Sequence, residues 1–269
     1  MKKKLLVSWS SGKDSAWALH VLRQSDAFEI VGLLTTINSS FDRVAMHGVR
    51  RELVEAQAGA AGLPLWPVPL PWPCSNEQYE GAMESVCAKA IREGVEAVAF
   101  GDLFLEDVRR YREERMTKAG LAPIFPLWKV DTEQLVRDMW AGGLRSRIVC
   151  VDPKQLPASF AGREIDPDLV GGLPAGVDPC GENGEFHTFA YDGPMFRRGI
   201  PVESGETVMR DGFVFSDLRL ATAAAVPEKA RETRRPAEIN FDHSVMRSPR
   251  LGGCEITSRR TAVDEGLLI

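Results

Sequence analysis

Apolar and polar positions alternate in blocks along the first 150 residues of the chain. Residues 4–10 form a short apolar run of strand-forming side chains, and residues 16–24 repeat apolar side chains at the i,i+4 spacing of a helix. The same alternation predicts further strands at 29–36, 64–70, 97–101, 123–128 and 146–151, and helices at 49–61, 76–93, 106–118 and 132–141. Strands separated by helices of about 10–15 residues are typical of a doubly wound parallel α/β sheet, which binds ligands at the carboxyl ends of its strands.

The pattern changes after about residue 152, where glycine and proline become frequent. Strands are predicted at 186–191, 207–210 and 213–220, and Asp211-Gly212 between the last two is a strong signal for a hairpin turn. We therefore expect a small β-rich second lobe that packs over the parallel sheet.

The last 48 residues, 222–269, have a third character. They hold 8 lysines and arginines against 7 acidic residues, one aromatic side chain and no sustained periodicity. Such a segment has little apolar surface to bury, so we predict a disordered or loosely docked tail. The predicted organisation is a parallel α/β domain at 1–130, a smaller β-rich lobe at 131–221 and this tail.

Composition narrows the class of protein. Of the 269 residues 44% are hydrophobic and 26% are charged, and the net charge is −5, which argues against a surface built for nucleic acid. No apolar run approaches the roughly 18 residues that a membrane span needs. The five cysteines are widely spaced without a CxxC pair, as in a reducing cytoplasm. We expect a cytoplasmic protein with no membrane segment, and its oligomeric state stays open.

The sharpest chemical signal lies in the turn between the first predicted strand and the first helix. It consists of Ser10, Ser11, Gly12, Lys13, Asp14 and Ser15. Small hydroxyl-bearing residues at a helix N-terminus let phosphate groups approach the free backbone N–H groups, and the helix dipole favours their charge. The alternative is an ordinary helix cap, but the position after the first strand of an α/β pattern favours phosphate binding. The loop is not a Walker A loop, because Val7 and Asp14 stand where glycine and Ser/Thr would be needed.

A second signal follows the strand predicted at 97–101. Asp102 comes at its carboxyl end, where a carboxylate points into the ligand crevice of such a sheet. Arg109, Arg110 and Arg112 lie on the next helix and are placed to meet a phosphate or a carboxylate. The alternative for most of these charges is a solvated helix face with pairs such as Arg110 and Glu114.

A third signal is the glycine-rich stretch 176–189. Glu182, Glu185 and His187 fall within six residues of a turn that enters a strand. Strand alternation places Glu185 and His187 on one face and Phe186 on the other. We predict catalytic roles for both carboxylates and the imidazole. A metal site is not expected, because no second histidine stands at ligand spacing.

Two of these motifs resemble those of a known family. The loop SSGKDS resembles the SGGxDS loop of the PP-loop ATP pyrophosphatases, with Ser11 in place of the first glycine, and GENGEFHT resembles the GEGGE[FY]ET element of the diphthine–ammonia ligase family. The resemblance covers residues 4–220. Asn183 stands where that family has glycine and His187 where it has glutamate. The family's SDYQRxRxE stretch matches LEDVRRYREE only with an insertion.

The resemblance implies a five-stranded, Rossmann-like nucleotide-binding sheet and an AMP-forming ligase that uses ATP and Mg²⁺. A carboxylate acceptor would attack the α-phosphorus, and ammonia or an amine would then displace AMP. Ser10 to Ser15 would hold the β,γ-phosphates, with Asp14 and Asp102 catalytic, and His47 and Gly48 would border the nucleotide. Glu182, Glu185 and His187 would serve the acceptor half-reaction.

Two rival functions stay open at this point. A non-catalytic nucleotide sensor would need the phosphate loop but not the carboxylates near Glu182. A sulfur transferase acting on tRNA would want paired cysteines and a basic face, and the sequence has neither. His47 and Gly48 could border the adenine pocket or the acceptor, or they could equally belong to an ordinary loop and helix start.

Overall fold

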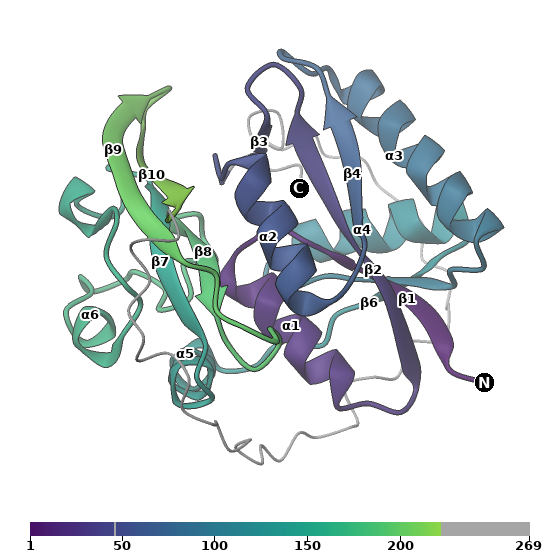
Figure 1. Cartoon of the computed structure of the whole chain (residues 1–269), viewed down its shortest axis with the longest axis horizontal. Coiled ribbons are helices and arrows are strands. Elements are labelled where there is room, and N and C mark those ends of the chain that lie inside the picture. The colour runs from purple at the N-terminus through teal and green to yellow at the C-terminus, as the bar shows by residue number, and fades with distance from the viewer. Residues whose placement is uncertain (46, 222–269) are drawn as a thin grey trace.

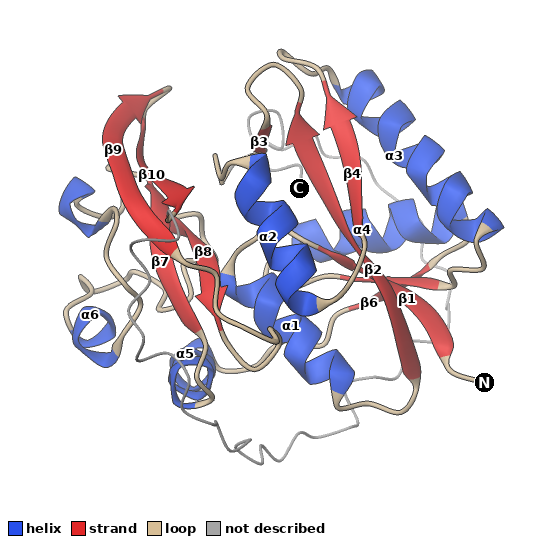
Figure 2. Cartoon of the chain, in the orientation of Figure 1, coloured by secondary structure: helices blue, strands red, loops and turns tan. Residues whose placement is uncertain are grey.

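Two β-sheets, one parallel and one antiparallel, form the framework of the chain (Figures 1 and 2). The computed structural model describes residues 1–45 and 47–221. The tail predicted at 222–269 lies outside the described residues.

The first sheet holds five parallel strands in the order β4-β2-β1-β5-β6. They are β1 (Lys3–Ser8), β2 (Phe28–Asn38), β4 (Leu65–Leu70), β5 (Ala97–Ala99) and β6 (Ala122–Ile124). A two-residue strand, β3 (Arg43–Val44), pairs antiparallel with the end of β2. The strand order reverses at β1. From β1 the chain first adds β2 and β4 on one side, and then β5 and β6 on the other side. The predicted five-stranded parallel sheet is therefore confirmed, and its ligand crevice is expected at the end of β1.

Helices cover both faces of this sheet. They are α1 (Lys13–Arg23), α2 (Arg51–Ala61), α3 (Asn76–Arg92) and α4 (Glu106–Ala119). Leu5 and Val7 of β1 share a core with α1 and α2, whereas Leu6 belongs to a second core with α3 and α4. Alternating side chains of one strand thus face two helical layers, which confirms the doubly wound arrangement.

The second sheet is antiparallel, in the order β8-β7-β10-β9. Its strands are β7 (Arg145–Val151), β8 (Phe186–Asp192), β9 (Val202–Arg210) and β10 (Phe213–Leu220). The prediction that residues 146–151 continue the parallel series is wrong, because β7 pairs antiparallel with β8 and β10. A central strand with both faces covered carries the same continuous apolar run as a buried parallel strand.

Turns and short helices complete the second lobe. The predicted hairpin turn is confirmed, with Asp211 at φ 50° and Gly212 at φ 83°. The remaining helices are α5 (Thr132–Ala141), α6 (Pro167–Gly171) and a single 3₁₀ turn at Ala158–Phe160. Among the described residues no helix is both long enough and apolar enough to cross a membrane.

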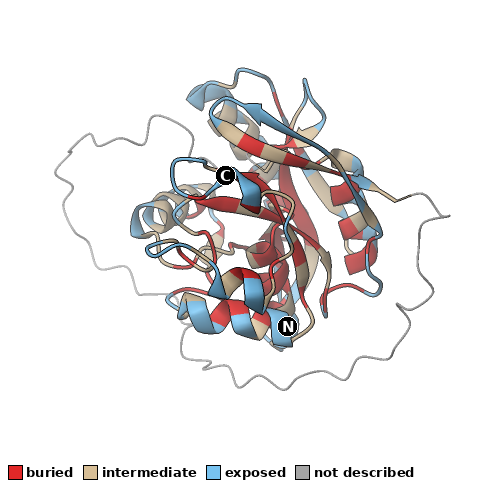
Figure 3. Ribbon diagram, turned by 90° about the vertical axis from the view of Figure 1, so that its left-hand side faces the viewer, coloured by how far each residue is buried: buried red, intermediate tan, exposed pale blue. Residues whose placement is uncertain are grey.

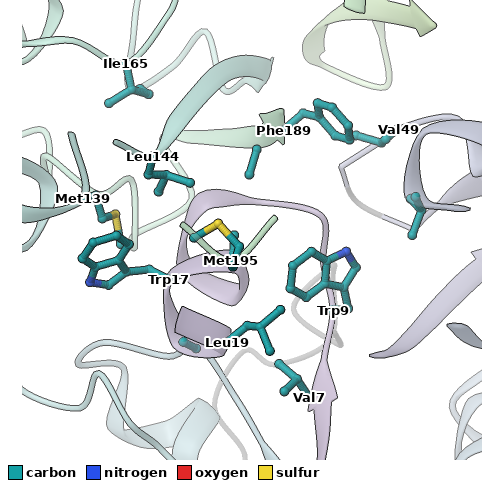
Figure 4. Packing of buried hydrophobic residues seen from close by; sticks show 14 of the residues in the cluster. Val7, Trp9, Trp17, Leu19, Val49, Met139, Leu144, Ile165, Phe189 and Met195 are labelled. Carbon is teal, nitrogen blue, oxygen red and sulfur yellow. The ribbon is translucent and has the colours of Figure 1, made fainter. Parts of the chain in front are cut away.

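The second sheet does not lie on the first sheet as predicted. Helices α1 and α2 lie between the two sheets, and β8 runs beside the start of α1 (Figure 1). Figure 4 shows Trp17 of α1 among Met139, Leu144 and Met195 of the second lobe. Buried residues continue from the sheets into the helices that cover them (Figure 3). One core therefore joins the two lobes and brings β8 to the loop between β1 and α1.

Candidate active site

The loop between β1 and α1 places a helix N-terminus at the crevice. Gly12 is the N-cap residue and makes no side-chain cap. The side-chain cap comes instead from Thr188 of β8, whose Oγ1 accepts a hydrogen bond from the Lys13 N–H at 3.0 Å. The Ser15 hydroxyl donates to Gly12 O at 3.0 Å, and Ser10 Oγ lies 3.3 Å from Ser15 Oγ. This geometry fits an anion at the positive end of the helix dipole.

A buried glutamine ties this loop to both lobes. The Gln57 side chain of α2 donates to Ser11 O at 2.9 Å and to Ala190 O at 2.6 Å, and it accepts from the Trp9 indole at 2.8 Å. The Ala190 N–H also donates to Ser11 O at 2.9 Å. Sequence analysis missed Gln57, although it is the polar residue on the core-facing side of α2, beside Val54 and Ala58 in the helical repeat.

Ser11 takes the backbone conformation that glycine usually provides. Its φ is 73°, its side chain is fully buried, and its hydroxyl has no hydrogen-bond partner. A non-glycine residue in the left-handed region costs about 1–2 kcal/mol. The turn therefore keeps the shape that the SGGxDS resemblance implies while carrying local strain at position 11.

One side of the loop is acidic, and we call Asp14, Asp102 and Glu182 the acidic flank. Lys13 lies at its centre: the ammonium donates to both Asp14 oxygens at 2.8 and 2.9 Å and to Cys180 O. Lys13 is only 2% exposed. Burial lowers the pKa of Lys13, but Asp14 and the other negative neighbours outweigh it and raise the pKa, so the ammonium stays charged.

Asp102 joins this flank through a close backbone approach. A Cβ on Gly101 would lie 3.0 Å from Asp14 C and Ser15 N, so only glycine lets the end of β5 lie against the first turn of α1. The Asp102 carboxylate lies 3.2 Å from Arg112 Nη1. Burial raises the pKa of Asp102 against the opposing effect of Arg112.

Glu182 reaches the flank from the second lobe. Its carboxylate accepts the N–H groups of Leu103 at 2.7 Å and Phe104 at 3.4 Å, in the loop after β5. Burial, then the charges of Asp14 and Asp102, raise the pKa of Glu182 to about 8. A carboxyl group with that pKa can exchange a proton near neutral pH.

Glu185 differs from Glu182 in what its carboxylate contacts. It lies before β8, whose first residue is Phe186, so the predicted strand alternation does not apply to it. The carboxylate turns back onto its own loop and accepts the Asp178 N–H at 2.9 Å, the Asn183 N–H at 3.0 Å and the Asn183 amide at 3.1 Å. These bonds fix the turn that presents Glu182, while a catalytic role for Glu185 itself stays a prediction.

Two histidines also lie near the loop, and we call His47 and His187 the imidazole flank. Their ring centroids are 4.6 Å apart with 30° between the planes. His47 Nδ1 lies 3.2 Å from Thr188 O. Burial is the main cause that lowers the pKa of His47, and His187 adds to it. Burial also lowers the pKa of His187, and with the charge of Lys13 it brings this pKa to about 4. Gly48 follows at φ 65°, and its carbonyl accepts from Arg43 at 2.6 Å.

The predicted arginines divide between the site and the surface of α4. Arg112 contacts Asp102, as described above. Arg109 pairs with Glu113 at 2.7 Å, and Arg110 pairs with Asp107 rather than with Glu114. Two of the three arginines thus belong to ion pairs along their own helix.

A cavity of about 280 Å³ opens between α3 and α4 and reaches the end of β1. Ser8, Thr36 and Phe100 line it from the sheet, and Tyr79 of α3 and Tyr111 of α4 line it from the helices. The Thr36 hydroxyl is buried without a hydrogen-bond partner. An aromatic and apolar cavity with a few unpaired polar atoms is typical of a small-molecule site.

The fold and this geometry define a class, that of parallel α/β proteins whose site lies at the topological switch point beside the first strand. Comparison with known families agrees with this class and narrows it. The model of the diphthamide synthase N-terminal domain matches residues 3–123, and that of the diphthamide synthase C-terminal domain matches residues 131–221. The chain belongs to the diphthamide synthase family.

Curated relatives carry the name diphthine–ammonia ligase. The Mus musculus protein is 29% identical over 65% of this chain and 67% of its own length. The Homo sapiens protein is 32% identical over 54% of this chain and 56% of its own length. The Danio rerio protein is 27% identical over 78% of this chain and 90% of its own length. The chain thus matches little more than half of the human relative.

Proposed function

We propose that this chain is an ATP-dependent, AMP-forming ligase that activates a carboxylate and joins it to ammonia. The observation that carries the proposal is the N-terminus of α1, whose N-cap is a glycine without a side chain, beside the acidic flank at the switch point of the sheet. The names of the curated relatives support the same reaction class. Positioning and electrostatics are what displacement at phosphorus needs most, and a rigid turn supplies both.

ATP would lie across the end of β1. Its β,γ-phosphates would meet the first turn of α1 at Asp14 and Ser15, and its nucleoside would enter the cavity lined by Ser8 and Thr36. The aromatic side chains of that cavity suit a purine ring, and the Thr36 hydroxyl gains a partner there. The α-phosphorus would then lie between the two sites, open to an incoming carboxylate.

Mg²⁺ fits this site as a companion of ATP. Among the described residues no group of three or more His, Cys, Asp and Glu side chains is arranged to hold a metal ion. Mg²⁺ commonly binds one or two carboxylates together with substrate phosphates, and Asp14 and Asp102 would be those carboxylates. The ion would neutralise charge on the departing pyrophosphate.

Glu182 is the group that we assign to the second half-reaction. Ammonia arrives largely as ammonium and must lose a proton before it attacks the acyl adenylate. The Glu182 carboxyl, whose pKa is raised to about 8 by burial and then by Asp14, is suited to exchange that proton near neutral pH. Glu185 supports it as a positioning residue through its three bonds to the loop.

The test is an ATP–pyrophosphate exchange screen over a panel of carboxylic acids, followed by product analysis with ammonium. Exchange that depends on one acid, with AMP and pyrophosphate as products, is the expected result. Formation of ADP would contradict the proposal. Tight ATP binding without exchange for any acid would favour the nucleotide sensor instead.

A further inference from the structure

The imidazole flank has no place in the proposed reaction, although it touches the phosphate loop. His47 lies between β3 and α2 and His187 on β8, 140 residues apart in the sequence, and their rings stack at 4.6 Å. Among the described residues the His187 ring makes no hydrogen bond, and the residue is only partly buried. A partly accessible imidazole with free ring nitrogens beside this loop is open to a bound ligand.

Contacts connect this pair to the start of α1. A Cβ on Gly12 would lie 3.0 Å from His47 Cε1, so the His47 ring packs directly on the loop backbone. The Thr188 hydroxyl accepts a hydrogen bond from the Lys13 N–H. The Thr188 carbonyl oxygen lies 3.2 Å from His47 Nδ1. The His47 ring therefore lies against the loop backbone, with the His187 ring beside it.

The permanent cations near the loop already have carboxylate partners. Lys13 contacts Asp14 at 2.8 Å, and Arg112 contacts Asp102 at 3.2 Å. Arg43 and Arg50, behind Gly48, both contact Asp217, at 2.9 and 2.7 Å. A polyphosphate on the loop thus meets cations that are already neutralised, and the imidazoles are the basic groups that remain.

We propose that His47 and His187 form a proton-linked anion subsite, in which the pair takes up one proton from solvent when the pyrophosphate part of the nucleotide binds. The proposal rests on the proposed function, because it assumes that the loop binds phosphates. The added proton sits on one of the two stacked rings, turns it into an imidazolium that faces the phosphate oxygens, and leaves again when pyrophosphate departs.

The charges around the pair agree with a neutral resting state. Lys13 of α1 faces both rings, and each ring faces the other. Cys150 of β7, opposite His187 in the strand register, has a pKa raised to about 12 by burial and is a neutral thiol. Burial and Lys13 keep the pKa of His187 at about 4, and a nearby phosphate acts in the opposite direction.

Calorimetry of inorganic pyrophosphate binding tests the proposal. Titrations at pH 7 in two buffers of different ionisation enthalpy give the number of protons taken up. We expect wild-type protein to take up at least about half a proton more than His187→Gln, a difference that cancels the protonation change of pyrophosphate itself. Between pH 8 and 6 wild-type affinity should rise about tenfold more than that of His187→Gln.

Matched variants separate the possible outcomes. His47→Gln should behave as His187→Gln, and His20→Gln, on α1 beside Gln24 and away from the loop, should behave as wild type. Equal proton uptake in wild type and both flank variants overturns the subsite and leaves the ligase proposal standing. Failure of wild-type protein to bind pyrophosphate or ATP at all overturns both.

A measurement on wild-type protein covers the case in which the variants do not fold. Long-range ¹H–¹⁵N spectra distinguish a neutral imidazole from an imidazolium. Addition of pyrophosphate at pH 7 should convert one ring of the pair to the charged form. Spectra in which both rings stay neutral at saturation would overturn the subsite.

Discussion

The acidic flank and the imidazole flank, both beside the loop from β1 to α1, differ in chemistry, but the pKa shifts in both have one physical cause. On the acidic flank burial raises the pKa of Asp102 and Glu182, and on the imidazole flank burial lowers the pKa of His47 and His187. In each case the uncharged form is favoured, because a charge loses solvation when it is buried. The carboxyl groups of one flank and the imidazoles of the other are therefore both shifted toward their neutral forms beside the loop.

The comparison also shows how the two lobes share the site. Each flank combines residues from both: Glu182 joins Asp14 and Asp102, and His187 joins His47. This arrangement divides the predicted constellation of Glu182, Glu185 and His187 into three separate places.

Replacing Asp14 should break the acidic flank most severely. In Asp14→Asn the loop loses a carboxylate proposed to hold Mg²⁺, and we expect turnover to fall by at least about 10²-fold. Stability should fall by about 3 kcal/mol, because the buried Lys13 ammonium loses its anionic partner. Pyrophosphate release and urea unfolding measure the two effects. Asp107→Asn, on the exposed start of α4, is the control, and near-normal turnover in Asp14→Asn would show that Asp14 serves only to pair with Lys13.

Removing the Gln57 side chain should destabilise the contact between the loop at Ser11 and strand β8 at Ala190. In Gln57→Leu the Trp9 indole and the carbonyls of Ser11 and Ala190 lose a buried partner. At about 1–3 kcal/mol for a buried group left unpaired, we expect a total loss of about 3 kcal/mol in urea unfolding. Gln134→Leu on the exposed side of α5 should change stability by less than about 0.5 kcal/mol. Equal losses in the two variants would contradict the assigned role of Gln57.

The pH dependence of stability should show the two flanks as opposite slopes. Native Glu182 holds a proton up to about pH 8, whereas unfolded glutamate releases it near 4.5, so this stability is present at low pH and lost as pH rises. Native His187 stays neutral down to about pH 4 while unfolded histidine is protonated below about 6.5, so stability is lost as pH falls.

Two variants separate these slopes. Glu182→Gln should flatten the alkaline limb of the unfolding free energy by about 1–2 kcal/mol between pH 6.5 and 8.5, and His187→Gln should flatten the acid limb below pH 6.5 by a similar amount. Urea unfolding at half-unit pH intervals checks both. Variants with the same pH profile as wild type would refute the burial of these two groups.

Relief of the strain at Ser11 should give the smallest effect. Ser11→Gly removes the left-handed penalty and an unpartnered buried hydroxyl, and adds backbone entropy to the unfolded chain. The net gain should be at most about 1 kcal/mol, measured as a rise in Tm. Asp211→Gly should gain less, since aspartate tolerates a positive φ. A lower Tm for Ser11→Gly would mean that the serine stabilises the loop.

Local patterns predicted the elements and the loop well because they depend on neighbours in the sequence. Strand β1, the turn from Ser10 to Ser15 and helix α1 follow one another, so periodicity and helix-start signals determine them. Strand β7 was assigned to the wrong sheet, because its apolar run says that it is buried but not which strands pair with it.

Contacts between distant segments had no such signal. His47 and His187 meet only because β8 runs beside the start of α1, and spacing along the chain cannot show that. The same holds for the Thr188 cap of Lys13. Gln57 did leave a trace, as a polar residue at a core position of α2, and such a residue requires buried partners.

A crystal structure with α,β-methylene ATP and Mg²⁺ tests the two-flank site most directly. The β,γ-phosphates should lie on the first turn of α1 between the acidic flank and His187, with the purine in the cavity lined by Ser8 and Thr36. Phosphates bound elsewhere, with Asp14 and His187 both out of reach, would contradict the site as a whole.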